Sequence, residues 1–388
     1  MKRKSQTRTR KSVLLALGWY VQEIALGVAR YARQAGWELN DTTSHNGMIP
    51  SAWDGDGIIT LIPGRRHKER IAFVLNAGVP VVDLSDQLPE LPFSRVLPDN
   101  LAIGRIAAEH FLCRGFMNLA FYSLDSRAPV VRERMEGFRL AVAARGRNFI
   151  AVDYTPMLKS SGAMKRLLEW LQRELAKLPK PVAIMAQYDG EANDVLRACV
   201  EAGIRVPEEV AVVGVDNDPI YRDLGPLPLS SVESNRELIG FRGAELLDRL
   251  MKGGEPPRDP IRIAPGGVVV RRSSDVVAVE DPAVVRAVEF IAQHYTDPIT
   301  VDDIVRFSGA SRRALYARFE QQVGHSILQE LIRQRMEKIK QLLRDTDVKL
   351  QVVAEQSGMR EAEYLSKCFR YYEGISITNY RRMFQQKI

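Results

Sequence analysis

The sequence predicts an α/β fold of parallel sheets with helices on both faces, followed by an all-α region. Two observations carry this prediction. From Ser12 to about Ser274, short apolar runs alternate with helical patterns, and between Pro298 and Tyr380 one pattern of paired short helices is written twice. Strands that are apolar throughout and linked by helices are typical of parallel sheets covered on both faces.

The α/β region contains six apolar runs of strand length, separated by amphipathic helical stretches. The expected strands are 13–17, 57–61, 79–84, 119–122, 182–185 and 210–215, and the expected helices are 21–35, 66–76, 100–114, 132–145, 162–178 and 189–202. Ligands of such folds bind at the carboxyl ends of the strands. Candidate ligand contacts are therefore sought in the residues that follow each strand.

Aromatic and acidic side chains gather at these strand ends. Trp19 and Tyr20 follow the first strand, Asp83 ends another, and Asp189 and Asp216 follow the two last strands. Carboxylates bind paired hydroxyl groups, and an aromatic ring covers the apolar face of a small ligand. A simpler reading makes Asp189 a helix N-cap and Asp216 a turn cap.

Several short runs in this region resemble the ligand-binding domain of LacI/GalR regulators. They are Asp99-Asn100, 110–116, Arg134-x-x-Gly137-Phe138, 213–217, 229–232, 240–250 and 270–274. The resemblance implies a periplasmic-binding-protein-like sensor over residues 13–274, whose two lobes close on a small ligand, usually a sugar. It assigns Arg134, Asp189 and Asp216 as ligand contacts, with Trp19 or Tyr20 as the cover and Asp83 as a further candidate. Alternatively, Arg134 pairs with Glu133 or Glu136.

The repeated pattern near the end of the chain is a helix with an apolar face, a turn containing glycine, and a second helix. Its copies are 301–319 and 350–369. A helix-turn-helix needs a small residue at the helix crossing and a residue free to take positive φ one turn later. Ala354 and Gly358 supply both in the second copy, whereas the first has Gly309 but Val305 at the crossing, which predicts a wider crossing. A stiff helix expected over 327–344 holds the copies apart.

Residues 301–384 resemble the DNA-binding domain of the AraC/XylS family, with Met359 and Ile377 as departures from the family pattern. The resemblance implies that two recognition helices enter successive major grooves of DNA. Leu315, Phe319, Leu365 and Phe369 are expected in the core. The predicted DNA contacts are Arg312, Arg313 and Tyr316 in the first recognition helix, and Arg360, Glu363, Tyr364 and Lys367 in the second. The alternative for these side chains is a solvated face or contact with phosphates alone.

Other parts of the chain set limits on its class. The net charge is +7, and residues 1–12 form a basic tail, expected to be disordered, that adds at most weak phosphate contacts. A connector, 275–281, precedes the all-α domain at 282–388. The apolar run after the tail is too short for a signal peptide or a membrane span, so a cytoplasmic location without membrane contact is expected. The three cysteines and five histidines show no metal or nucleophile spacing.

The two resemblances together predict a sugar-responsive, sequence-specific transcription regulator. We expect an activator that binds a double-stranded DNA operator as a homodimer, with a monosaccharide effector, no cofactor, and RNA polymerase as a further candidate partner. Xylose is the first candidate sugar because of the domain order: the sensor precedes a domain with two helix-turn-helix motifs, whereas ordinary LacI relatives place a single DNA-binding helix pair first. The alternatives are a DNA-binding regulator whose sensor binds a non-sugar ligand or none, and an enzyme with a DNA-binding tail, which no acid/base pair or phosphate loop supports.

Overall fold

The structure is a computed structural model that describes residues 10–46, 48–159, 162–276 and 281–384. Most of the predicted tail and of the predicted connector therefore lies outside the described residues. The chain forms two compact units: unit 1 comprises Met1–Gly104, Asp125–Gly137 and Val232–Gly266, and unit 2 comprises Arg105–Leu124, Phe138–Ser231 and Gly267–Ile388. Each unit is described by itself.

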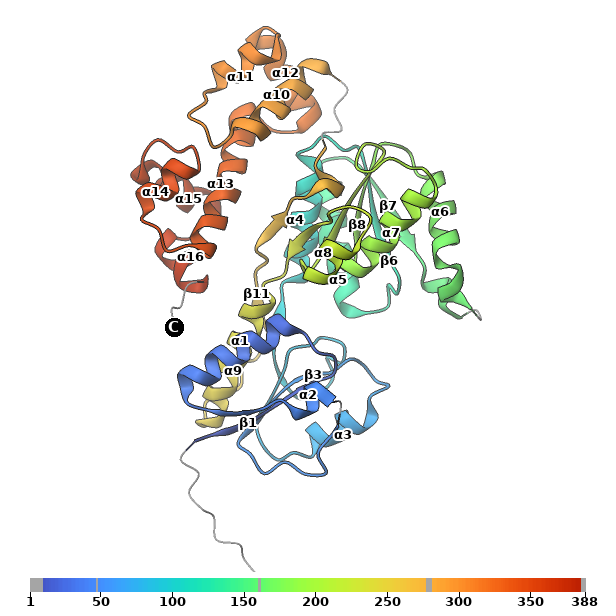
Figure 1. The fold of residues 1–388 in the computed structure, drawn as a ribbon, viewed down its shortest axis with the longest axis vertical. Helices are drawn as coiled ribbons and strands as arrows, with labels where there is room; N and C mark the ends of the chain where they lie inside the picture. Colours follow the sequence, from blue (N-terminus) through green and yellow to red (C-terminus); the bar gives the residue numbers. More distant parts are fainter. Residues whose placement is uncertain (1–9, 47, 160–161, 277–280, 385–388) are drawn as a thin grey trace, which may run out of the picture. The chain divides into compact units, whose positions relative to one another are not determined.

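Unit 1 is built on a six-stranded sheet with the order β11-β5-β4-β3-β1-β2, in which every recorded pairing is parallel. The strands are β1 (Ser12–Leu17), β2 (Glu38–Asn40), β3 (Gly57–Leu61), β4 (Val81–Asp83), β5 (Ser94–Pro98) and β11 (Ile261–Ile263). Helices α1 (Gln22–Ala35) and α9 (Arg236–Met251) cover one face, and α3 (Lys68–Leu75) covers the other (Figure 1). A short helix, α2 (Thr42–Asn46), follows β2.

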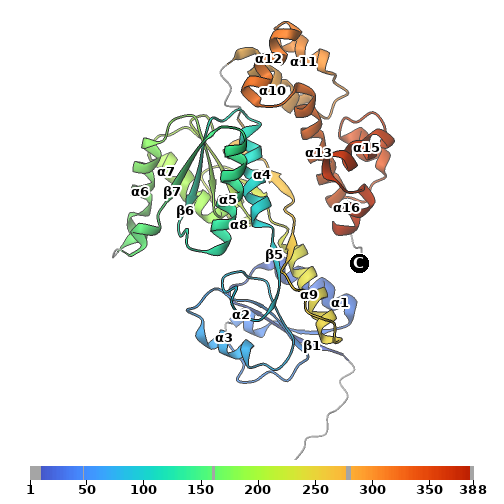
Figure 2. The ribbon, with the colours of Figure 1, turned by 180° about the vertical axis from the view of Figure 1, so that it is seen from behind.

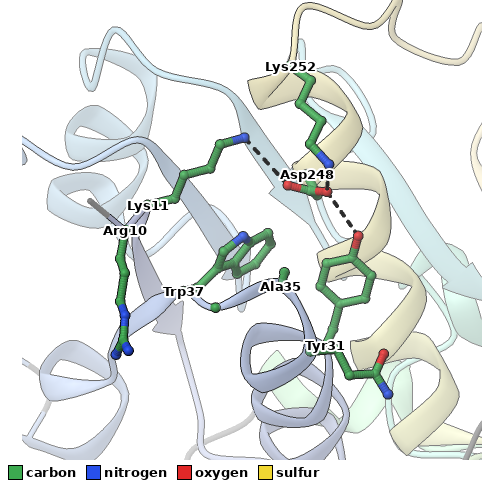
Figure 3. Close-up of a pocket in the computed structure, with 9 residues that line it drawn as sticks. Arg10, Lys11, Tyr31, Ala35, Trp37, Asp248 and Lys252 are labelled. Carbon is green, nitrogen blue, oxygen red and sulfur yellow. Dashed lines mark hydrogen bonds and ion pairs between the residues drawn. The ribbon is translucent and has the colours of Figure 1, made fainter. Parts of the chain in front are cut away.

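One surface pocket of unit 1 shows how the first strand is attached (Figure 3). The carboxylate of Asp248 accepts hydrogen bonds from Lys252 Nζ at 2.6 Å, from the Tyr31 hydroxyl at 3.1 Å and from Lys11 Nζ at 3.5 Å. Burial, followed by the bond to Asp248, raises the pKa of Tyr31 to about 12, so this hydroxyl remains a donor. The pocket is therefore a structural node that ties β1 and α1 to the end of α9.

Unit 2 begins with a second six-stranded sheet, in the order β12-β10-β9-β8-β6-β7. Its strands are β6 (Asn118–Ser123), β7 (Asn148–Asp153), β8 (Val182–Ala186), β9 (Val210–Val215), β10 (Ser230–Glu233) and β12 (Gly267–Val269). Helices α6 (Leu167–Lys177) and α7 (Asp189–Glu201) pack on one face. Side chains alternate along a strand, so Phe121 points the other way and meets Phe138 of α5 (Pro129–Ala144) with 6.1 Å between ring centroids. Helices α4 (Asn100–Leu112) and α8 (Pro219–Leu224) complete the α/β part.

The rest of unit 2 is all helical, as predicted. Its helices are α10 (Pro282–His294), α11 (Val301–Ser308), α12 (Arg312–Val323), α13 (Ile327–Asp345), α14 (Leu350–Gln356), α15 (Ala362–Glu373) and α16 (Ile377–Phe384). The long helix α13 contributes Ile327 and Leu331 to a core with α10–α12, and Met336 and Ile339 to a second core with α14–α16 (Figure 2). Within the described residues, no helix is both long and apolar enough to cross a membrane.

The predicted fold class is confirmed, and all six predicted strands are present. The sequence reading missed β2, β5, β7, β10, β11 and β12, which are short or partly exposed and, except for β12, carry polar residues. The helix expected over 162–178 is α-helical only from Leu167, because a 3₁₀ turn, Ala163–Arg166, precedes it.

Candidate functional site

The aromatic candidates of unit 1 follow β1 and face solvent. Trp19 is 46% exposed and Tyr20 is 53% exposed. Large aromatic side chains are mostly buried in folded proteins, so two consecutive exposed rings at a strand end are unusual. Both rings therefore stay candidates for covering the apolar face of a ligand.

Asp83, the last residue of β4, is placed differently from the other candidates. Its side chain is fully buried and accepts hydrogen bonds from the backbone N–H groups of Ile62, at 3.3 Å, and Ser85, at 3.2 Å. Burial raises its pKa to about 7, against the opposing effects of these bonds and of Arg95, 4.0 Å away. In this structure Asp83 organises the loops after β3 and β4, and its contact with a ligand stays a prediction.

Arg134 lies in a buried polar network of unit 1. It is 2% exposed, and its Nε donates to Asn100 Oδ1 at 3.1 Å. Asn100 Nδ2 in turn lies 3.4 Å from Asp86 Oδ2 and 3.3 Å from Glu133 Oε2. Arg262 binds both oxygens of Glu133, at 2.8 and 2.9 Å. A fixed guanidinium of this kind is suited to binding hydroxyl or carboxylate oxygens.

Asp86 is the member of this network that the sequence reading missed. Burial raises the pKa of its carboxyl, Glu133 raises it further, and Arg134 lowers it. A carboxylate held among such partners is a candidate site residue. It follows Asp83 by three residues, so it lies in the segment that the strand-end criterion selected.

In unit 2, Asp189 holds a loop in place. It is the first residue of α7 and 2% exposed, and it accepts hydrogen bonds from the Ser231 hydroxyl at 2.6 Å and from the Asp218 N–H at 2.8 Å. A Cβ on Gly214 would lie 2.1 Å from Asp189 Oδ1, so only glycine fits beside this carboxylate. Asp189 is not the N-cap of α7, which is Tyr188, and its carboxylate instead joins α7 to β10 and to the loop after β9.

That loop has unusual backbone geometry. Asp216 has φ 104° and Asn217 has φ 52°, in a region that side chains other than glycine rarely adopt. The Asn217 N–H donates to Ser231 Oγ at 2.8 Å, and Arg271 Nη2 donates to Asn217 Oδ1 at 2.7 Å. Such conformations cost about 1–3 kcal/mol each, persist only where the surroundings impose them, and cluster at ligand sites. Ser231 and Arg271 lie in runs that carried the resemblance, but neither was predicted to have a role.

The first helix-turn-helix, HTH1, consists of α11 and α12. Gly309 in its turn has φ 71°, as predicted, and the Ser311 hydroxyl caps α12. Arg312 donates to Asp302 of α11 at 2.7 Å, and its guanidinium lies 5.5 Å from the ring centroid of Tyr316. Arg313 is exposed. Of the predicted DNA contacts of HTH1, Arg312 and Arg313 are exposed, whereas Tyr316 is half-buried and packs against the core. Leu315 and Phe319 of the same helix are buried, as predicted.

The second helix-turn-helix, HTH2, consists of α14 and α15. Gly358 has φ 71°, and Ala354, Leu365 and Phe369 are fully buried, as predicted. Arg360 was assigned to the recognition helix, but α15 begins only at Ala362, so Arg360 lies in the turn before it.

The predicted DNA contacts on α15 itself are exposed. Lys367 Nζ lies 3.0 Å from Glu363 Oε1 one turn away, and both side chains are more than 70% exposed. Tyr364 is 50% exposed. A surface pair of this kind is weak and separates readily when DNA offers other partners.

Among the described residues, no group of three or more histidine, cysteine, aspartate or glutamate side chains is arranged to hold a metal ion.

Comparison with known proteins assigns both parts of the chain. Residues 108–274 match a periplasmic binding protein-like domain, and residues 304–383 match a helix-turn-helix domain. The chain is 30% identical to the xylose operon regulatory protein of Escherichia coli K12 over 93% of this chain and 94% of that protein. It is 28% identical to the protein of the same name from Haemophilus influenzae, over 90% of this chain and 92% of that protein.

Solved structures agree with this assignment. The xylose-binding transcription activator XylR superposes with a TM-score of 0.58 at 27% identity, over 97% of this chain and 98% of that chain. The complex of the regulator CelR with cellobiose gives 0.53 at 25% identity, over 68% and 85%. The chain therefore belongs to the family of the xylose operon regulatory proteins, and it is a DNA-binding transcription regulator rather than an enzyme.

Proposed function

We propose that this protein activates carbohydrate utilisation genes in response to a monosaccharide, with xylose as the first candidate. The observation that carries the proposal is full-length similarity to regulators named for the xylose operon, with the sensor ahead of the double helix-turn-helix. The protein acts in the cytoplasm as a homodimer and recruits RNA polymerase at its operator.

Each unit carries candidate sugar contacts of this proposal. Arg134 and Asp216 bind sugar hydroxyls. Arg134, on α5, is held by Asn100, and Asp216 lies in the loop after β9, where Ser231 and Arg271 hold the next residue, Asn217. Asp189 holds the loop that carries Asp216. Trp19 or Tyr20 covers the apolar face of the ring. Asp86 joins the set as a partner of Arg134.

The DNA-binding residues of this proposal lie on the exposed sides of HTH1 and HTH2. Arg313 and Lys367 contact base edges, since Arg and Lys bind guanine O6 and N7 in the major groove. Arg312, Tyr316, Arg360 and Tyr364 contact bases or phosphates, and Glu363 accepts from cytosine N4. The sugar shifts the population of sensor conformations, and a near-complete switch takes about 5.5 kcal/mol of differential binding.

The test is a thermal melt of the full-length protein with D-xylose, L-arabinose, D-ribose, D-glucose and cellobiose. A sugar at about 100 times its Kd stabilises the folded protein by about 2.7 kcal/mol, which is readily seen as a higher Tm. In Asp216→Asn, asparagine tolerates the positive φ of this position but lacks the charge, so the rise in Tm caused by the sugar should disappear. Glu201→Gln, an exposed acid of α7, is the matched control and should keep the shift.

The alternative, a DNA-binding regulator with a non-sugar ligand or none, predicts no shift with any of these sugars. Footprinting on promoter DNA with and without D-xylose completes the test. Protection that depends on xylose supports the proposal, whereas protection that ignores every tested sugar supports the alternative.

A further inference from the structure

HTH1 and HTH2 are connected twice. The first connection is α13, whose side chains enter both helical cores. The second is the loop between α10 and α11, which belongs to the HTH1 core through Tyr295 and Ile299 and also reaches the turn of HTH2. A helix shared by two bodies still bends gently along its length. A second point of contact opposes that bending, because the two bodies then cannot move independently.

One arginine lies at this second contact. Arg335, in the middle of α13, donates from Nε to the carbonyl oxygen of Tyr295 at 2.8 Å, and from Nη2 to the carbonyls of Asp297 at 2.8 Å and Ile299 at 3.3 Å. A planar guanidinium presents several donors in a rigid fork, which an ammonium group does not. Arg335 thus fixes the path of the whole α10–α11 loop relative to α13.

The HTH2 turn meets the same loop through Gly358. A Cβ added there would lie 2.4 Å from the Tyr295 carbonyl oxygen, 2.9 Å from the Thr296 carbonyl carbon and 3.0 Å from Arg335 Nε. The glycine is therefore needed for close approach as well as for its φ of 71°. Gly309 holds the same position in HTH1 and has the same φ. A Cβ added there would have Arg286 Nη2 as its nearest neighbour, at 3.6 Å. The glycine of the HTH2 turn thus makes the closer backbone approach, whereas the HTH1 turn is held through a side chain, Arg286 of α10, which donates to the Ser308 carbonyl oxygen at 2.9 and 2.6 Å.

Electrostatics agree with this placement. Burial lowers the pKa of Arg335, Tyr364 raises it and Arg360 lowers it further. Two of the predicted DNA contacts of HTH2 are therefore within electrostatic reach of the guanidinium. Any shift of Arg335 changes the surroundings of both.

We infer that Arg335 and Gly358 form a joint that sets the distance and angle between the two recognition helices, and hence the spacing of the two DNA elements that the protein reads. This inference rests on the proposed reading of DNA by both motifs and adds a positioning role for residues that need not touch DNA. The simpler reading is that Arg335 caps the end of α10, where side chains of Arg often bind free carbonyls. A cap alone affects stability but not the preferred spacing.

The test begins with DNA sites selected from a random library by the full-length protein, with and without D-xylose. One base pair is then inserted or removed between the two elements, which moves them by about 3.4 Å along the duplex and about 35° around it. Wild-type protein should lose about tenfold or more in affinity. Arg335→Ala should lose less than about threefold between spacings, whereas Lys338→Ala, which removes a partly exposed cation from the same helix, should behave as wild type.

Gly358→Ala approaches the joint from its other side and should relax the spacing in the same way. Gly309→Ala carries the same backbone strain without the clash and should leave the spacing preference unchanged. Arg335→Lys keeps the charge but loses the fork, so it tests the joint if Arg335→Ala fails to fold.

The outcomes separate the inference from the proposed function. If the protein selects no two-element site, the proposed DNA reading by both motifs fails, and the inference fails with it. If a two-element site is recovered but Arg335→Lys and Gly358→Ala keep the wild-type spacing preference, the joint is rejected while the proposed function stands.

Discussion

HTH1 and HTH2 share one plan but are stabilised by different means. The helices of HTH1 and the helix after it begin with side-chain caps, from Thr300, Ser311 and Ser326. For α14 and α15 of HTH2, the described residues show no side-chain cap. A cap contributes about 1 kcal/mol. HTH1 is therefore the better stabilised motif locally, and HTH2 depends more on its packing against α13, α16 and the α10–α11 loop.

The two recognition helices also differ in charge. Three arginines and one glutamate give α12 a net charge of +2, whereas one lysine, one arginine and two glutamates leave α15 neutral. Phosphate attraction dominates the affinity of DNA-binding proteins and is independent of sequence. We therefore expect HTH1 to contribute more of the phosphate attraction to DNA, and HTH2 to depend more on direct contacts to bases.

The largest expected effect comes from removing the aromatic core residue of each motif. Phe319→Ala and Phe369→Ala should each cost about 3–5 kcal/mol, because both rings are fully buried. Hydrogen exchange should show that Phe369→Ala unfolds HTH2 while HTH1 stays protected, whereas Phe319→Ala should spare part of HTH2. Equal loss of protection in both motifs, from either substitution, would contradict separate cores.

The next effect concerns the helix that follows each motif. At the start of α13, the buried Glu330 binds His325 at 2.9 Å, Arg333 at 2.7 Å and Gln334 at 2.8 Å. Tyr380 of α16 stands at the corresponding place after HTH2 and packs against Phe369. Breaking a buried charge pair costs about 3 kcal/mol or more. We therefore expect Glu330→Ala to destabilise HTH1 strongly.

The same contrast predicts a pH dependence. Burial alone would raise the pKa of Glu330, but Arg333 and His325 together lower it below its usual value. Stability from this carboxylate is present above the unfolded-state pKa and is lost as pH falls through the lower folded-state pKa. Lowering the pH should therefore open HTH1, which hydrogen exchange measured across the titration would detect. Glu330→Gln should make the stability of HTH1 less dependent on pH and leave the acid response of HTH2 unchanged.

Substitution of the base-reading cations should have an intermediate effect. We expect Arg313→Ala and Lys367→Ala each to weaken specific binding by about 1–3 kcal/mol. On unrelated DNA, Arg313→Ala should lose a larger share of its affinity than Lys367→Ala, because HTH1 carries the excess positive charge. Binding measured across a salt series checks this difference. Unchanged operator affinity in both variants would remove these residues from the proposed interface.

The smallest effect should come from the acid that holds Arg312. Asp302→Asn removes an exposed partner, so it should tighten DNA binding by less than about 1 kcal/mol and steepen the salt dependence. Asp303→Asn is a poor control because Asp303 caps α11. Glu320→Gln, on α12, is the better comparison.

The sequence predicted features that depend on local pattern. The apolar strands, the two glycine turns and the buried pairs Leu315/Phe319 and Leu365/Phe369 are confirmed, because periodicity and backbone freedom are properties of a short segment. It missed short strands whose place in the sheet depends on distant neighbours.

The partners of the candidate site residues could not be predicted, for the same reason. Strand-end position did not single out Asp86, because its surroundings are set by Asn100, Glu133 and Arg134, which come from later in the chain. The clasp of Ser231 and Arg271 on Asn217 likewise joins residues 14 and 54 positions apart.

The continuity of α13 limits how this family can change in length. Each residue turns an α-helix by about 100° and lengthens it by about 1.5 Å. A one-residue insertion between Leu331 and Met336 would therefore rotate one set of core side chains away from its partners. Insertions and deletions should be rare in this segment during evolution, whereas substitutions on the exposed faces of α12 and α15 can accumulate and supply new operator preferences.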